Sequence, residues 1–130
     1  MQRYRGIRTV LFAGIWINTS EFVRNELLLK SYWVEHYRLL GMTFPSEPLN
    51  AILWVVWGFL FALALFVISR KFSLMQTALI SWLIAFVLMW VVAWNLRVFP
   101  ISILVYAVPL SLLEAFVGSY ICHGAAKRET

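Results

Sequence analysis

Apolar residues dominate three long runs of the chain, at residues 49–69, 72–94 and 98–122. The first two runs contain no charged residue, and the third contains only Glu114. A helix needs about 20 apolar residues, at about 1.5 Å each, to cross the hydrocarbon core of a bilayer. Each run therefore predicts a transmembrane helix.

A shorter apolar run at residues 10–17 precedes these three and cannot cross a bilayer by itself. It continues into residues that favour a helix but include Glu21, Arg24 and Glu26. We expect one helix from about Ile7 to about Lys30, whose second half faces protein or water because lipid cannot satisfy polar groups. A cleaved signal peptide is the alternative, but residues 18–20 (NTS) do not form the small-residue cleavage site that it requires.

The segment between the first two predicted spans, residues 31–48, is rich in aromatic residues and predicts a short helix in the membrane interface. Gly41 is expected to end this helix, and Ser46 to cap the next one ahead of Pro48. The other two links, residues 70–71 and 95–97, are so short that consecutive spans must be antiparallel. The predicted fold is an all-α integral membrane protein, an up-down bundle of four transmembrane helices at about 7–30, 49–69, 72–94 and 98–122.

Composition agrees with this fold, since 62% of the 130 residues are hydrophobic and only 13% are charged. The spans use the whole chain, so we expect a single membrane domain over residues 1–130. The net charge of +5 is explained by basic flanks of the spans rather than by nucleic-acid binding. Lys and Arg residues favour one side of the bilayer by seven to four, which predicts cytoplasmic termini in a plasma (inner) membrane. The seven are Arg3, Arg5, Arg8, Arg70, Lys71, Lys127 and Arg128.

Polar residues recur along one face of the first predicted helix. At about 100° per residue, Gly14, Asn18, Glu21 and Asn25 lie on one stripe, which must point into the bundle. Arg24 lies off the stripe but can reach Glu21 three residues earlier. The residues indicate either a polar helix end packed near the interface or a pocket that opens to the outer face.

Glu114 has no basic residue near it on its own helix. Counting depth from the cytoplasmic ends places Ser81 and Asn18 near its level, and Arg24 more than about 12 Å further out. We therefore expect a neutral, hydrogen-bonded carboxyl rather than an ion pair. It would either lock the fourth helix to the first and third, or take up and release a proton.

Other chemistry has less support in the sequence. One cysteine and no aspartate give no recognisable metal set, and no catalytic or cofactor motif is present. His36 and His123 fall on opposite sides of the predicted membrane. The seven tryptophans, of which Trp16 and Trp82 lie deepest, are expected to serve as interface anchors and in packing rather than as an aromatic ligand box.

The size and the four-span layout resemble those of the small multidrug-resistance exporters, which also place a glutamate in their first helix. In that family the glutamate exchanges protons for cationic drugs. In this chain Glu21 is followed by FVRNE and lies in the outer half of its helix, and the loop at residues 31–48 is additional. The resemblance is one of architecture, and it assigns no residue a role.

These features favour a small proton- or ion-linked transporter or channel-like protein without a cofactor, not an enzyme. Its polar pathway would include Glu114, Glu21, Asn18, Asn25, Arg24 and Ser81. The alternative is a non-catalytic accessory or assembly subunit of a membrane complex, and a third hypothesis is an intramembrane lipid-modifying enzyme. Four short helices offer few internal pathways, so the expected partners are the lipid bilayer and a homo-oligomer or larger complex.

Overall fold

The computed structural model describes residues 2–127; Met1 and residues 128–130, which include Arg128 of the basic set, lie outside it. Within that range the structure is helical with short links. The elements in chain order are α1 (Gln2–Phe22), the π-helix η1 (Val23–Leu28), α2 (Lys30–Leu39), α3 (Pro48–Ser69), α4 (Leu74–Trp82), the π-helix η2 (Leu83–Val87), α5 (Leu88–Asn95), the 3-10 turn η3 (Ile101–Ile103) and α6 (Leu104–Lys127).

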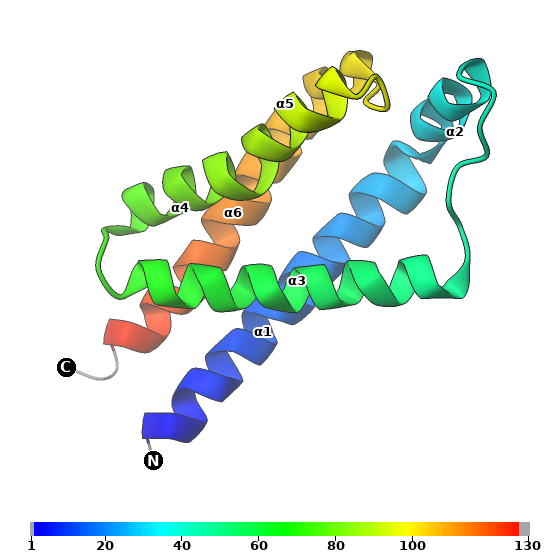
Figure 1. Cartoon of the computed structure of the whole chain (residues 1–130). Helices are drawn as coiled ribbons and strands as arrows, with labels where there is room; N and C mark the ends of the chain where they lie inside the picture. Colours follow the sequence, from blue (N-terminus) through cyan, green and yellow to red (C-terminus); the bar gives the residue numbers. More distant parts are fainter. Residues whose placement is uncertain (1, 128–130) are drawn as a thin grey trace.

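Four rods alternate in direction along the chain, namely α1–η1, α3, α4–η2–α5 and η3–α6 (Figure 1). α1 packs against α3 and α6, α4 packs against the same two helices, and α3 also contacts α6. α1 begins and α6 ends on the same side of the molecule, which we call the terminal end. α2 and the turn between α5 and η3 lie on the opposite side, which we call the α2 end (Figure 1).

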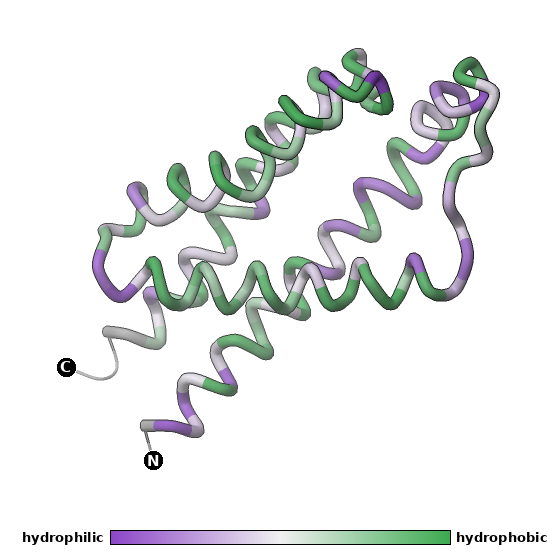
Figure 2. Tube along the Cα trace, in the orientation of Figure 1, coloured by the Kyte–Doolittle hydropathy of each residue, from purple (hydrophilic) through white to green (hydrophobic). Residues whose placement is uncertain are grey.

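Three helices are long and apolar enough to cross a membrane, Pro48–Ser69, Leu74–Asn95 and Ile101–Ala125, with mean hydropathies of 2.7, 2.2 and 1.9. The protein is therefore an integral membrane protein. Figure 2 shows that hydrophobic residues cover α3 and α5, whereas hydrophilic residues gather in the turns, in the first turn of α1 and along η1 and α2. The helix formed by α1 and η1 does not meet the same criterion of length and hydropathy.

Most helix boundaries lie within a few residues of the sequence expectations, but α6 continues to Lys127, beyond the expected Cys122, and two helix starts also differ. α1 begins at Gln2, before the expected Ile7. α3 is capped by Glu47 and not by Ser46, because the Glu47 side chain and the Asn50 side chain each bond the other residue's backbone N–H in a capping box. Gly41 follows α2 with a φ of 73°, a left-handed conformation that glycine adopts without strain.

Two π-helical segments interrupt the long helices, η1 in the first rod and η2 in the third. The apolar periodicity of the sequence did not predict them, because a π-turn changes the backbone hydrogen bonds but not the residue types. Such segments are rare and occur frequently at functional sites. Both carry a buried residue of the candidate site, Arg24 in η1 and Phe86 in η2.

Candidate functional site

A cluster of three charged side chains lies inside the bundle. Arg24 of η1 donates from Nη2 to Oε1 of Glu21, one turn earlier on α1. The other terminal nitrogen, Nη1, lies 3.7 Å from Oε1 of Glu114 on α6. Glu21 also accepts a 2.9 Å hydrogen bond from Nδ2 of Asn25. We call Glu21, Arg24 and Glu114 the charged cluster.

The charged cluster is enclosed by protein. Glu114 is fully buried, and Glu21 and Arg24 are only 5% and 6% exposed. Neither carboxyl oxygen of Glu114 has a hydrogen-bond partner within residues 2–127, and the same is true of Arg24 Nη1. An arginine remains charged at all accessible pH values. The cluster therefore has a net charge of −1 when both carboxyls are ionised, and is neutral when they share one proton.

The expectation that no basic residue reaches Glu114 was wrong. Depth counting used Cα positions alone, but side chains on helices tilt toward the helix N-terminus. α1–η1 and α6 run in opposite directions, so the side chain of Arg24 extends toward the terminal end and that of Glu114 toward the α2 end. Because the two side chains point toward each other along the bundle axis, their lengths close the gap that the residue count predicted.

Phe86 forms one wall of the charged cluster. The guanidinium carbon of Arg24 lies 5.0 Å from the centre of the fully buried Phe86 ring, within cation–π distance. The same ring contacts Phe61 edge-on at 5.7 Å and Trp57 at 5.9 Å. The aromatic core of α3 and η2 is thus in direct contact with the cation of η1, at a point where two π-helical segments meet.

Two tryptophans attach neighbouring helices to α6 beside the cluster. Trp16 of α1 donates from Nε1 to the backbone carbonyl of Glu114 at 3.0 Å. Trp82 of α4 donates from Nε1 to Oγ of Ser111 at 2.9 Å. The sequence placed both residues deep in the bundle but did not assign them partners. A buried indole N–H needs a hydrogen-bond acceptor, and this need was the available sign that each tryptophan has a polar partner.

The remaining predicted site residues divide between two roles. Asn25 joins the cluster, as the stripe on helix one predicted. Asn18 instead faces α3, where its Nδ2 donates to the carbonyls of Gly14 at 2.9 Å and Val55 at 3.5 Å. Ser81 donates to the carbonyl of Thr77 in its own helix at 2.6 Å. Neither Asn18 nor Ser81 is a hydrogen-bond partner of Glu114, because each satisfies its polar group on a nearby backbone.

Charged side chains at the α2 end pair locally, at spacings of three and four residues along the helix. Lys30 bonds Glu26 at 2.9 Å, and Arg38 binds both carboxyl oxygens of Glu35 at 2.6 and 2.9 Å. The hydrogen bonds from Arg38 lower the pKa of the exposed Glu35 carboxyl below its usual value. These pairs leave the charged cluster as the buried ionic site of the described chain.

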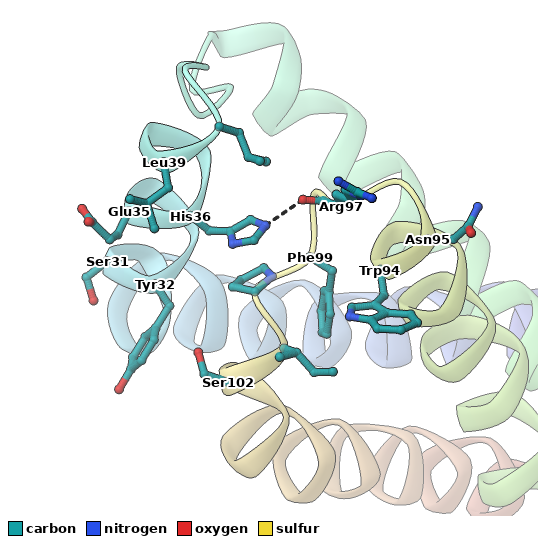
Figure 3. Close-up of a pocket in the computed structure, with 13 residues that line it drawn as sticks. Ser31, Tyr32, Glu35, His36, Leu39, Trp94, Asn95, Arg97, Phe99 and Ser102 are labelled. Atoms are coloured by element: carbon teal, nitrogen blue, oxygen red, sulfur yellow. Dashed lines mark hydrogen bonds between the residues drawn. The ribbon is translucent and has the colours of Figure 1, made fainter.

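A cleft of about 1090 Å³ opens at the α2 end, between α2 and the turn that joins α5 to η3 (Figure 3). His36 Nε2 donates across it to the carbonyl of Arg97 at 2.8 Å, which fixes the proton of the imidazole on that nitrogen. The cleft wall combines polar and aromatic side chains, among them Tyr32, Trp94 and Phe99. The sequence predicted a short interfacial helix in this region but gave no indication of the cleft.

Among the described residues no group of three or more His, Cys, Asp or Glu side chains is placed to hold a metal ion. Comparisons with protein-family models, with curated proteins and with solved structures find no match to this chain. The site must therefore be interpreted from its own geometry.

Proposed function

We propose that this protein is a small proton-linked transporter or channel-like protein, in which the charged cluster takes up and releases a proton. The observation that carries the proposal is the cluster itself, two carboxyls and one permanent cation enclosed in an apolar bundle. Intramembrane ionisable groups are costly and mark ion pathways or proton relays by default. Because one proton separates a charged from a neutral state, protonation at Glu114 or Glu21 changes the electrostatic energy of the packed helices.

The proposal includes α1–η1 as a fourth span. Its mean hydropathy is lowered by polar residues such as Asn18, Glu21 and Arg24, but Glu21 and Arg24 are buried against protein and do not face lipid. Exposed apolar residues on the same helix, including Leu11, Phe12 and Ile15, suit contact with acyl chains. The proposed orientation, with the terminal end in the cytoplasm of a plasma (inner) membrane, is supported by the basic residues near the start of α1 and in the α3–α4 turn.

An apolar plug separates the charged cluster from the α2 end. It consists of Leu29, Phe99, Ile103 and Ala107, each at most 3% exposed. Leu29 follows Arg24 by five residues, and Ala107 precedes Glu114 by about two helical turns. The arrangement corresponds to a closed state, and transport requires that these residues separate.

Hydroxyl groups line the opposite direction, toward the terminal end. Thr77 and Ser81 of α4 and Ser119 of α6 are at most 1% exposed, and these two helices pack together. Near the terminal end, Thr77 Oγ1 lies 3.2 Å from Nε2 of His123. A path for a proton from the cluster to His123 would follow this interface.

Proton flux into proteoliposomes that contain a pH-sensitive dye tests the proposal. With a potassium diffusion potential imposed, vesicles with the wild-type protein should acidify faster than empty vesicles. Glu114→Gln should abolish this difference, because an amide cannot exchange the proton. Glu26→Gln, which alters an exposed pair on the same rod, is the matched control and should retain the flux. Flux that is equal in Glu114→Gln and wild type would refute the assignment.

A non-catalytic assembly subunit is the second candidate, and the complete burial of Glu114 favours it. In that case the charged cluster locks η1 to α6, and the outer segment 31–47 docks a partner. Wild-type vesicles without proton flux, together with a stoichiometric second protein after purification in mild detergent, would support this function over transport. For the transporter we propose a homo-oligomer. It would contain only this polypeptide, and its native mass would be a multiple of the mass of one chain. The third hypothesis, a lipid-modifying enzyme, has no specific observation in its favour.

A further inference from the structure

The cleft at the α2 end has an unbalanced positive charge. Arg97 and Glu35 both contribute to its wall, but Glu35 is bound through both oxygens to Arg38. None of the ion pairs among residues 2–127 involves Arg97. A guanidinium without a carboxylate partner suits a phosphate group, to which it can donate two parallel hydrogen bonds.

The backbone fixes the position of this arginine. Arg97 has a φ of 64°, and its N–H and that of Val98 bond back to the carbonyls of Trp94 and Ala93 in a Schellman turn at the end of α5. His36 of α2 holds the Arg97 carbonyl from across the cleft (Figure 3). A non-glycine residue in the left-handed region is strained, and such residues cluster at ligand-binding sites.

The same cleft offers an apolar surface next to this cation. The Phe99 ring, 3% exposed, forms the wall of the cleft, and Trp94 and Ile101 lie on it with more than half of their surface exposed. The cleft lies where one membrane-spanning segment ends at Asn95 and the next begins at Ile101. This is the level at which a phospholipid changes from headgroup to acyl chain, and where tryptophan side chains prefer to lie.

We propose that the cleft binds an anionic phospholipid of the surrounding bilayer, with its phosphate on Arg97. Ser31 and Ser102, which also line the cleft, offer hydroxyl donors to the headgroup. The acyl chains would run along Trp94 and Ile101 toward the hydrocarbon. This site is separate from the charged cluster and does not depend on whether the protein transports protons.

Native mass spectrometry of the detergent-purified protein tests the site. Phosphatidylglycerol and phosphatidylcholine with identical acyl chains are added in equal amounts, and the lipid adducts are counted. The wild type should retain one phosphatidylglycerol in preference to phosphatidylcholine. Arg97→Gln should reduce that preference about fivefold, the effect expected for one basic residue near an anionic membrane surface. Arg97→Lys keeps the charge but not the two parallel donors, so it should lose less of the preference than Arg97→Gln does. Lys30→Gln, an equal charge change at the same end but outside the cleft, should leave it unchanged.

Three results would overturn the proposal. An Arg97→Gln protein that retains phosphatidylglycerol as the wild type does would place the lipid elsewhere. An equal loss in Lys30→Gln would indicate general surface charge. Inorganic phosphate that binds the lipid-free protein in an Arg97-dependent manner, and is not displaced by phosphatidylglycerol, would make the cleft a small-anion site. Circular dichroism of each variant shows whether the fold is retained. Arg97→Gly, which removes the guanidinium at a backbone position that glycine adopts without strain, decides the result if the Gln variant is misfolded.

Discussion

Arg24 and Glu114 lie on antiparallel rods, and their side chains meet with Nη1 and Oε1 3.7 Å apart in the middle of the bundle. Glu21 contacts the same guanidinium, so one cation serves two carboxyls. Removal of one member of a buried ionic group leaves the others without compensation, which costs more than the group contributes to stability. The three residues should therefore respond differently to neutralisation.

Neutralisation of Arg24 should destabilise the protein far more than neutralisation of Glu114. Arg24→Gln leaves two buried carboxyls without a cation and should lower the free energy of unfolding by about 3–5 kcal/mol. Glu114→Gln leaves a balanced pair of Glu21 and Arg24, and should cost less than about 1 kcal/mol or stabilise. The single cysteine, Cys122, is 1% exposed, so its reaction with a thiol-reactive dye during heating reports unfolding.

The exposed pair of Glu26 and Lys30 provides the comparison, since both side chains are more than 40% accessible. Lys30→Gln should change stability by less than about 0.5 kcal/mol, the usual range for surface pairs. If Glu114→Gln proved as damaging as Arg24→Gln, the argument from charge balance would be wrong.

The Phe86 ring should stabilise the charged cluster in two separable ways. Phe86→Leu keeps most of the apolar volume but removes the face that Arg24 contacts, and should cost about 1–2 kcal/mol. Phe86→Ala also creates a cavity among Phe61 and Trp57, and should cost about 3–5 kcal/mol. The same thermal assay measures both. A Phe86→Leu protein as stable as the wild type would show that only packing matters at this position.

The sequence predicted the helices well, because long apolar runs and short links leave few alternatives. The three apolar spans, the helix after the first rod and its end at Gly41 all agree with the structure. Local ion pairs were also predictable, since spacings of three and four residues determine which side chains meet on a helix. The pair of Glu21 with Arg24 was found in this way, and the pair of Glu35 with Arg38 has the same spacing.

Contacts between helices could not be predicted to the same degree. The pairing of Arg24 with Glu114 depends on helix tilt and on side-chain direction, which residue counting ignores. The π-helical turns that present Arg24 and Phe86 have no sequence signal of their own. The polar stripe predicted on the first helix does face the inside of the bundle, but its residues contact different neighbouring helices. Asn18 faces α3 while Glu21 faces α6, since α1 packs against both helices.

The close packing of α1 on α3 should make Gly58 intolerant of any side chain. A Cβ atom at Gly58 would lie 2.5 Å from Oδ1 of Asn18, whose amide is held by the carbonyl of Gly14. Gly58→Ala should therefore cost about 1–3 kcal/mol, the usual range for overpacking. Gly124→Ala is the control, because a Cβ there meets nothing within 4 Å, and in a helix it should stabilise by up to about 1 kcal/mol. A neutral Gly58→Ala would indicate that α1 and α3 can separate readily.

α2 and α5 face each other across the cleft and end in the same type of turn. The residue at the left-handed position of that turn differs between them. After α2 the left-handed position is Gly41, and after α5 it is Arg97. In both turns the N–H of the left-handed residue and the N–H of the residue after it bond back to the last helical turn. An L-residue with a side chain costs about 1–2 kcal/mol in this conformation, whereas glycine does not. Arg97→Gly should therefore raise the free energy of unfolding by about 1 kcal/mol, and Gly41→Ala should lower it by a similar amount.

Thermal unfolding of both variants in the same detergent measures this pair of opposite shifts. The double variant should be close to wild type, because the two sites lie in separate turns and their effects should add. Arg97→Gly must also weaken retention of phosphatidylglycerol if the guanidinium binds the phosphate. Greater stability combined with weaker lipid binding would show that the strain at Arg97 is maintained for the ligand. A less stable Arg97→Gly protein would mean that the arginine side chain itself holds the turn together.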